Sequence, residues 1–213
     1  MSVRSIAIKP ALISADFNEV SQKISDLETL CQTVHIDVSD GQFSPLTTHY
    51  TPDDLYDIPG KVQLEAHLMI NEPEDTLKAW AGVVDRVIVQ AEATKNLGLI
   101  IESLEPHYTK VGVSLLLNTP IDEVEDFFDK LDLIQLMAIE NIGKQGEKLD
   151  EIIYAKTKYL SGKFDGIIQI DGGVTKANAP ILVEHGANSL VVGSAIWQAD
   201  DYVKAVEDFM DLF

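Results

Sequence analysis

The chain has 213 residues, of which 46% are hydrophobic and 24% are charged, a balance typical of a folded globular protein rather than a disordered one. It carries 35 acidic residues against 16 basic ones, for a formal net charge of −19, and Arg4 and Arg86 are its only arginines. Such a chain cannot assemble the basic surface that binds nucleic acid, and an anionic membrane surface would repel it. If its substrate is an anion, we expect backbone amides rather than an arginine clamp to hold it.

The single cysteine, Cys31, excludes an internal disulfide framework, and its apolar surroundings predict a buried thiol. The first ten residues show no signal-peptide pattern, and no apolar stretch reaches the ~20 residues that span a bilayer. We therefore expect a cytoplasmic protein with no membrane partner. No linker composition or charge run divides the chain, so residues 1–213 are interpreted as one domain.

Short runs rich in β-branched residues recur along the chain and predict eight strands. These are Ile6–Ile13, Thr33–Val38, Val62–Met69, Arg86–Ala91, Val111–Leu117, Leu133–Ile139, Gly166–Ile170 and Ser189–Val192. Amphipathic spacing between and after them predicts helices. These are Val20–Cys31, a short one near Asp53–Tyr56, Glu72–Trp80, Leu97–Glu105, Ile121–Leu131, Lys148–Leu160, Lys176–His185 and Asp200–Phe209.

This alternation of strands and helices demands parallel pairing through right-handed crossovers. Eight such units close naturally into a (β/α)8 TIM barrel, for which 213 residues is a compact size. A doubly wound open sheet is the structural alternative. That fold normally has a glycine-rich first crossover, whereas Ile6–Val20 contains no glycine. The barrel is therefore the fold that we predict.

Chemically active side chains lie near the carboxyl ends of the predicted strands, which converge on one mouth of such a barrel. His35 and Asp37 are two residues apart in the second strand and so point to the same side. His67 can face inward from the third strand, and Asp171 follows the seventh. Two imidazoles and two carboxylates at one rim make a site for a divalent transition metal. The alternative reading, a loop-capping histidine and helix-capping acids, explains any one of these residues more easily than all four.

Glycines follow the last two predicted strands. Gly172 and Gly173 come after the seventh strand, and Gly193 and Ser194 come after the eighth. Barrels of this kind commonly bind phosphate there, through unhindered backbone N–H groups. A phosphate bound by amides would also be compatible with a strongly acidic chain.

Five segments together resemble the ribulose-phosphate 3-epimerase family, in that family's order and roughly its spacing from Pro10 to Ile196. They are Ser14-Ala15-Asp16-Phe17, His35–Gly41, His67-Leu68-Met69, Asp171-Gly172-Gly173 and Gly193-Ser194-Ala195-Ile196. The resemblance implies a TIM barrel of the ribulose-phosphate binding type. It also implies interconversion of D-ribulose 5-phosphate and D-xylulose 5-phosphate in the pentose phosphate pathway.

The resemblance further implies a divalent metal cation (zinc, iron, manganese or cobalt) and no organic cofactor. The metal would be held by His35, Asp37, His67 and Asp171, and Asp37 and Asp171 would be the catalytic acid/base pair on opposite faces of the substrate. Other implied substrate-binding residues are Ser14, His67, Met69, Met137, Gly143, Gly146, Gly172, Gly173, Gly193 and Ser194. Family members form dimers or hexamers, which implies a homo-oligomer whose size does not follow from this sequence.

Several positions depart from the family pattern. Ser39 replaces a methionine, Gln90 replaces a histidine, and Ser44-Pro45-Leu46 stands where the family has V-P-N. The loop Glu140–Gly146 lacks the P-G-F-G-G-Q of the family's phosphate-closing lid, and its Lys144 is either a phosphate contact or an exposed loop lysine.

Because the lid differs, epimerisation of a hexulose 6-phosphate such as allulose 6-phosphate is the nearest alternative. A non-catalytic phosphosugar-binding barrel is another, although no acid/base or metal residue is missing. The decarboxylases that share this fold carry a lysine within a D-x-K-x-x-D motif. That lysine is absent from Asp37-Val38-Ser39-Asp40, which argues against decarboxylation.

Overall fold

The computed structural model describes residues 5–14, 16–56, 58, 62–104, 107, 109–144 and 146–213. Within these residues, eight parallel strands close into a barrel in sequence order, and β1 pairs with β8 to complete it. The strands are β1 (Ala7–Leu12), β2 (Thr33–Ser39), β3 (Gln63–Met69), β4 (Arg86–Gln90), β5 (Lys110–Leu115), β6 (Leu133–Met137), β7 (Ile167–Asp171) and β8 (Ser189–Val192). The predicted (β/α)8 barrel is therefore confirmed, and each predicted strand overlaps one of these.

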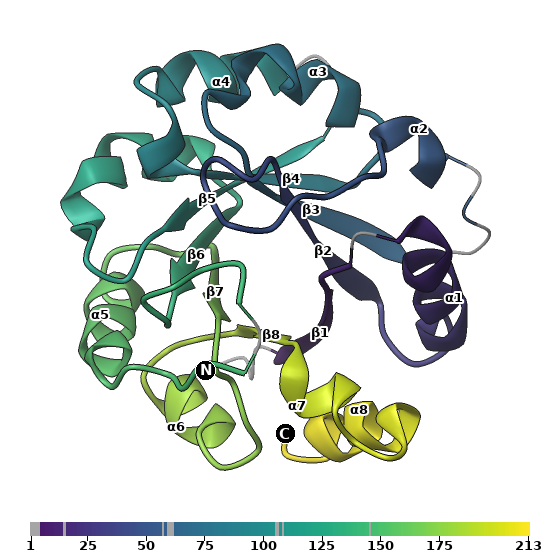
Figure 1. Cartoon of the computed structure of the whole chain (residues 1–213). Helices are drawn as coiled ribbons and strands as arrows, with labels where there is room; N and C mark the ends of the chain where they lie inside the picture. The colour runs from purple at the N-terminus through teal and green to yellow at the C-terminus, as the bar shows by residue number, and fades with distance from the viewer. Residues whose placement is uncertain are drawn as a thin grey trace.

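Helices surround the barrel on its outside (Figure 1). The α-helices are α1 (Phe17–Leu27), α2 (Pro52–Leu55), α3 (Leu77–Trp80), α4 (Leu97–Leu104), α5 (Ile152–Ser161), α6 (Ala179–Glu184), α7 (Ser194–Trp197) and α8 (Tyr202–Met210). The 3-10 helices are η1 (Pro73–Asp75), η2 (Ala91–Ala93) and η4 (Ile121–Lys130). Each of the predicted helices therefore has a helical counterpart.

Four helix predictions need correction. The helix expected from Lys148 begins at Ile152, and before it the Asp150 N–H bonds to the Ala138 carbonyl (2.8 Å) instead of continuing a helix. The first helix was expected over Val20–Cys31, but α1 begins at Phe17 because the Asp16 side chain caps it by accepting from the Asn18 N–H (2.9 Å). The segment expected as one helix over Glu72–Trp80 is divided into η1 and α3. The Ile121–Leu131 segment winds as a 3-10 helix rather than an α-helix.

The two faces of each strand have different chemistry. In β2, Val34, Ile36 and Val38 belong to the main hydrophobic core, while the residues between them are buried and polar. This two-residue period places apolar side chains under the helices and polar side chains in the lumen of the barrel. A TIM-barrel lumen is usually filled by branched aliphatic side chains. The buried polar side chains in the lumen of this chain therefore indicate a functional role in addition to packing.

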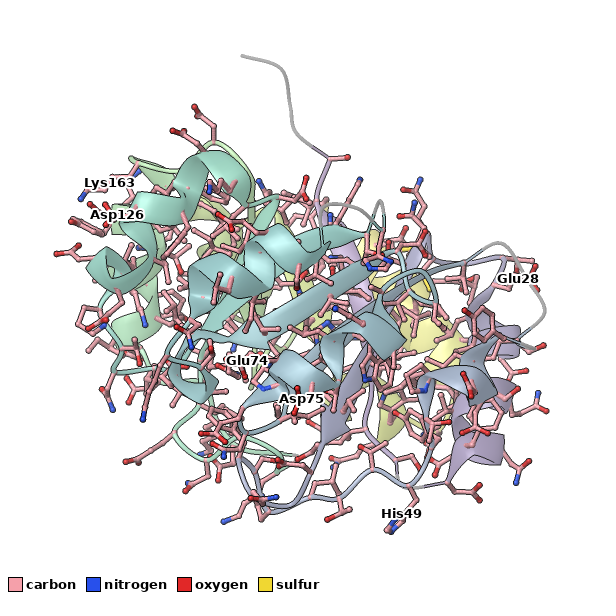
Figure 2. The ribbon with its side chains drawn as sticks, turned by 90° about the horizontal axis from the view of Figure 1, so that it is seen from above. Glu28, His49, Glu74, Asp75, Asp126 and Lys163 are labelled. Carbon is pink, nitrogen blue, oxygen red and sulfur yellow. The ribbon has the colours of Figure 1, made fainter. Side chains whose placement is uncertain are left out.

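Charged side chains are spread over the outside of the molecule, as Figure 2 shows for Asp126 and Lys163. Surface ion pairs such as the one between Lys163 and Glu125 contribute little stability, because water screens them. Cys31 is buried, as predicted. Among the described residues, no helix is long and apolar enough to cross a membrane.

Candidate metal and active site

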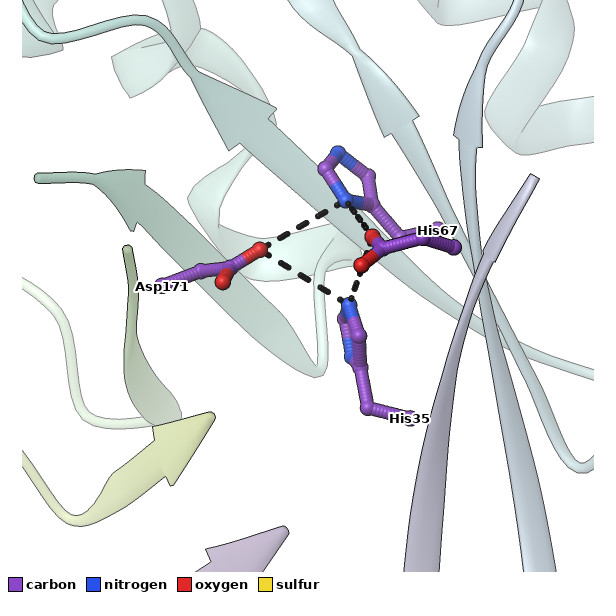
Figure 3. Close-up of side chains that lie close together, drawn as sticks. His35, His67 and Asp171 are labelled. Atoms are coloured by element: carbon purple, nitrogen blue, oxygen red, sulfur yellow. Dashed lines mark hydrogen bonds and ion pairs between the residues drawn. The ribbon is translucent and has the colours of Figure 1, made fainter. Parts of the chain in front are cut away.

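Four titratable side chains from three strands meet at the carboxyl end of the barrel. The β2–β3 register places Asp37 beside His67, and the inward face of β7 adds Asp171. His35, Asp37, His67 and Asp171 each offer one ligand atom, and these atoms lie within 4.8 Å of one another. Figure 3 shows His35, His67 and Asp171 pointing toward one another. The predicted grouping of these four residues is therefore present in the structure.

The contacts inside this cluster join each imidazole to both carboxylates. His67 Nδ1 lies 3.0 Å from Asp37 Oδ1 and 3.6 Å from Asp171 Oδ2. His35 Nε2 lies 3.4 Å and 3.8 Å from the same two oxygens. Among the described residues, neither carboxylate has a lysine or arginine at ion-pair distance, so the chain places two buried acids together without a permanent cation.

One atom of the cluster has no hydrogen-bond partner. His35 Nε2 is fully buried and unpaired, and it points at the two carboxylates. A buried polar atom without a partner is costly, so its neighbourhood usually contains something that satisfies it. Imidazole nitrogens and carboxylate oxygens are a donor set that suits zinc, iron, manganese or cobalt. The residues present therefore fit a divalent metal ion.

The two aspartates differ in their affinity for a proton. Burial would raise the pKa of Asp37, but its close contacts with His35 and His67 and their charge outweigh burial and hold this pKa far below its usual range. Burial raises the pKa of Asp171 to about 6, and the negative charge of Asp37 adds to the effect. Two carboxylates whose pKa values are pushed apart are suited to different proton-transfer roles.

His35 responds to the same charges. Burial alone would lower the pKa of its imidazole, but contacts with the Asp37 and Glu65 carboxylates and the charge of Asp171 raise it to about 10. An added proton would go to Nε2, because Nδ1 already faces Glu65 at 2.9 Å. A metal ion at Nε2 would take the place of that proton.

A cavity opens over the cluster and extends toward the predicted phosphate end. Its wall includes Asp37 and Asp171 together with eight of the predicted substrate-binding residues: Met69, Met137, Gly143, Gly146, Gly172, Gly173, Gly193 and Ser194. The glycines after β7 are needed for this backbone path, because both have positive φ (+104° at Gly172 and +66° at Gly173). A Cβ at Gly173 would also lie 2.3 Å from the Leu149 nitrogen.

The loop between β6 and α5 covers this cavity. Its Ile142 is buried with Met69, Met137 and Ile139, and Gly143 packs so closely against the β2–α2 loop that a Cβ there would lie 2.6 Å from Ser44 Oγ. The space left below has a volume of about 60 Å³, whereas small-molecule pockets usually hold about 300–1,000 Å³. In this structure the loop therefore leaves little room above the cluster.

Comparison with known proteins decides the family. A sequence model of the ribulose-phosphate 3 epimerase family matches residues 7–197. The chain belongs to the ribulose-phosphate 3-epimerase family. It is accordingly an isomerase of the class that epimerises carbohydrates.

Curated members of the ribulose-phosphate 3-epimerase family match nearly the whole chain. The ribulose-phosphate 3-epimerase of Bacillus subtilis is 37% identical, and the match covers 95% of this chain and 97% of that protein. The chloroplastic ribulose-5-phosphate-3-epimerase of Arabidopsis thaliana is 34% identical, with 97% of this chain and 76% of that protein covered.

More distant solved structures share the fold alone. A 3-hexulose-6-phosphate synthase superposes with a TM-score of 0.72 at 16% identity, covering 98% of this chain and 100% of that chain. A variant tryptophan synthase alpha-subunit from Pyrococcus furiosus gives a TM-score of 0.71 at 13% identity, covering 97% of this chain and 95% of that chain.

Two predicted substrate contacts lie outside the cavity wall. Ser14 donates to Glu19 Oε2 (2.7 Å), and this part of the chain instead presents Ala11 of β1 and the following Ile13 to the cavity. His67 is fully buried behind the wall and reaches the site only through Nδ1. The substrate-binding roles of both residues stay predictions.

Residues that support the site from below were not predicted. Glu65 contacts His35, Gln90 contacts His67, and Gln135 donates to Asp171 Oδ2 (3.1 Å). One signal for Glu65 was available in the sequence, since it precedes His67 by two residues and therefore shares its face of β3.

Proposed function

We propose that this epimerase interconverts D-ribulose 5-phosphate and D-xylulose 5-phosphate by metal-assisted epimerisation at C3. The observation that carries the proposal is one cavity whose wall joins two aspartates of the buried His35, Asp37, His67 and Asp171 cluster to a glycine-lined end. The identity to relatives named ribulose-phosphate 3-epimerase supports the same substrate.

Removal of a proton next to a ketone leaves an enediolate, whose negative charge must be stabilised. His35, Asp37, His67 and Asp171 would hold a divalent metal ion, which supplies Lewis-acid stabilisation of that charge. The protein must also bring one base and one acid to opposite faces of C3, because epimerisation returns the proton from the other side.

Asp37 and Asp171 come from β2 and β7 and so approach the cavity from different sides. Asp37, with its depressed pKa, stays ionised and is available as a base. Asp171, with its pKa raised to about 6, holds a proton more readily and supplies it to the opposite face. In the reverse reaction the two residues exchange roles.

Backbone groups are the proposed ligands of the substrate phosphate. Gly172, Gly173 and Gly193 leave their N–H groups unhindered at one end of the cavity, and Ser194 adds a hydroxyl. Lys144 is exposed and also lines this end, so it can add a positive charge. Glu147 lines the cavity too, but Asn141 donates two hydrogen bonds to its carboxylate (3.0 and 3.3 Å).

A substrate panel tests the proposal. Chelator-treated protein is reloaded separately with zinc, iron(II), manganese or cobalt and assayed on ribulose 5-phosphate and allulose 6-phosphate. We expect one or more metals to restore epimerisation and the pentulose phosphate to be preferred. Preference for the hexulose phosphate would overturn the assigned substrate, and activity in no metal-loaded sample would overturn the catalytic role.

A further inference from the structure

We propose that Glu65 and Gln90 hold the two imidazoles of the cluster in opposite tautomers, and that Gln90 is a positioning residue for the metal centre. The metal part of this inference rests on the proposed metal-assisted function. The tautomer part depends only on hydrogen bonds within this chain.

His35 is held from the amino-terminal side of the lumen. Its Nδ1 lies 2.9 Å from Glu65 Oε1. The Glu65 carboxylate is also paired with two buried cations, Lys9 at 2.6 Å and Arg86 at 3.0 Å, so it stays ionised and can only accept. Nδ1 of His35 therefore carries the hydrogen, and Nε2 is left to face the two aspartates.

His67 is held through its other nitrogen. Its Nε2 lies 2.9 Å from the Gln90 amide, whose orientation its neighbours decide. With the oxygen toward His67, that oxygen also accepts from Ser114 Oγ (3.1 Å), and the amide nitrogen donates to the Ser114 carbonyl (3.3 Å) and Glu92 Oε2 (3.1 Å). Every group is then satisfied, so Nε2 of His67 carries the hydrogen.

The free nitrogen of His67 is consequently Nδ1, which lies 3.0 Å from Asp37 Oδ1. The Gln135 amide nitrogen is 3.2 Å from Nδ1, and it also donates to Asp171 Oδ2 at 3.1 Å. If a metal ion replaced the proton on His35 Nε2, ring nitrogens of two different kinds, Nε2 of His35 and Nδ1 of His67, would offer their lone pairs beside the same carboxylates. A change of tautomer at His67 would put an N–H into the cluster and block one ligand position.

A comparison of Gln90 variants tests this assignment. Gln90→Met removes the hydrogen-bond acceptor of His67 Nε2 while keeping a similar shape. Gln90→Glu keeps an oxygen for His67 Nε2. Gln63→Met, at the other end of the neighbouring strand β3, is the matched control. Zinc affinity is measured by competition with a chromophoric chelator, because a role in packing alone would not change it. We expect Gln90→Met to weaken zinc binding about 10–100-fold and the other two variants to stay within about threefold of the parent. Unchanged affinity in Gln90→Met would overturn the positioning role.

Nitrogen-15 spectra of the histidine rings separate this inference from the proposed function. In zinc-loaded parent protein we expect the hydrogen on Nδ1 of His35 and on Nε2 of His67, and the reverse at His67 would overturn the inference even if Gln90→Met fails to fold. If the parent takes up no zinc, the proposed metal function fails. The spectrum of the metal-free protein then tests the tautomer assignment: a hydrogen on Nε2 of His67 supports it, and a hydrogen on Nδ1 alone overturns it.

Discussion

Two layers of the barrel lumen both contain buried carboxylates, but only one layer also contains the lysine and arginine that pair with them. In the lower layer, which we call the floor (Lys9, Glu65, Arg86 and Gln169), the Glu65 carboxylate meets both cations and an amide within 3.0 Å. In the upper layer, the rim (His35, Asp37, His67 and Asp171), the two carboxylates lie beside imidazoles and the Gln135 amide, with no lysine or arginine at ion-pair distance among the described residues. Buried acids that carry their own cations are explained by structure, whereas buried acids without one point to a bound cation and to chemistry.

The largest expected effect is on catalysis at the rim. We expect Asp37→Asn and Asp171→Asn each to lower kcat by about 10²–10⁴-fold, the usual contribution of general acid–base catalysis. The measurement is steady-state epimerisation in both directions. The exposed Asp126→Asn is the control and should retain parent activity. Parent-like kcat in either rim variant would show that its carboxylate does not transfer the proton.

Removal of the floor carboxylate should affect stability most. We expect Glu65→Gln to lower the free energy of unfolding by about 3–5 kcal/mol at pH 7, because it leaves buried Lys9 and Arg86 without their counter-charge. Urea unfolding of metal-free protein provides the measurement. A loss below about 1 kcal/mol, the usual contribution of an exposed ion pair, would show that the floor carboxylate does not stabilise the fold through its buried ion pairs.

The stability difference between the parent and Glu65→Gln should depend on pH. Burial opposes ionisation of Glu65, but the charge of Lys9 and the contact with His35 outweigh burial and hold its pKa well below the ordinary value of 4.5. Its contribution to stability is therefore complete above about pH 4.5, the unfolded value. That contribution disappears as the pH falls through the folded pKa. Urea midpoints of parent and Glu65→Gln should converge in acid, and a gap that widens below pH 4 would contradict this sign.

Metal bound at the rim should raise the stability of the folded protein. At a free metal concentration 100 times Kd, we expect about 2.7 kcal/mol of added stability by mass action. Calorimetric melting of chelator-treated and reloaded protein measures it. Asp171→Asn should show a smaller shift than the parent, and equal shifts in both would mean that the metal binds elsewhere.

The smallest effect is expected in the loop over the rim. Gly143 has φ +78°, and a Cβ there would lie 2.6 Å from Ser44 Oγ. Gly143→Ala should therefore destabilise the loop in its present position by about 1–3 kcal/mol. We expect KM to rise about tenfold or more. Gly82→Ala is a matched control, since Gly82 has φ +85° with no atom within 4 Å of an added Cβ. An equal change in KM in both variants would indicate general backbone strain rather than loss of the loop contact.

Much of this arrangement was predictable from local pattern. The period of two along a strand, with the convergence of strand ends, placed His35, Asp37, His67 and Asp171 together. The floor was not predicted, because Lys9 and Gln169 are 160 residues apart and their contact depends on side chains crossing the lumen. The Asp16 cap that starts α1 and the 3-10 winding of η4 were missed for a related reason, since short-range hydrogen bonds choose between helix types that share one apolar pattern.

A metal titration observed at the reacting carbon tests whether metal bound at the rim is needed for proton exchange. Chelator-treated protein in D2O is titrated with an activating metal while NMR follows deuterium entry at C3 of D-ribulose 5-phosphate. We predict no exchange before metal is added and a plateau at one equivalent per chain, since the rim supplies one cluster of ligands. Full exchange in metal-free protein would contradict metal-assisted epimerisation, and so would metal uptake at the rim without exchange.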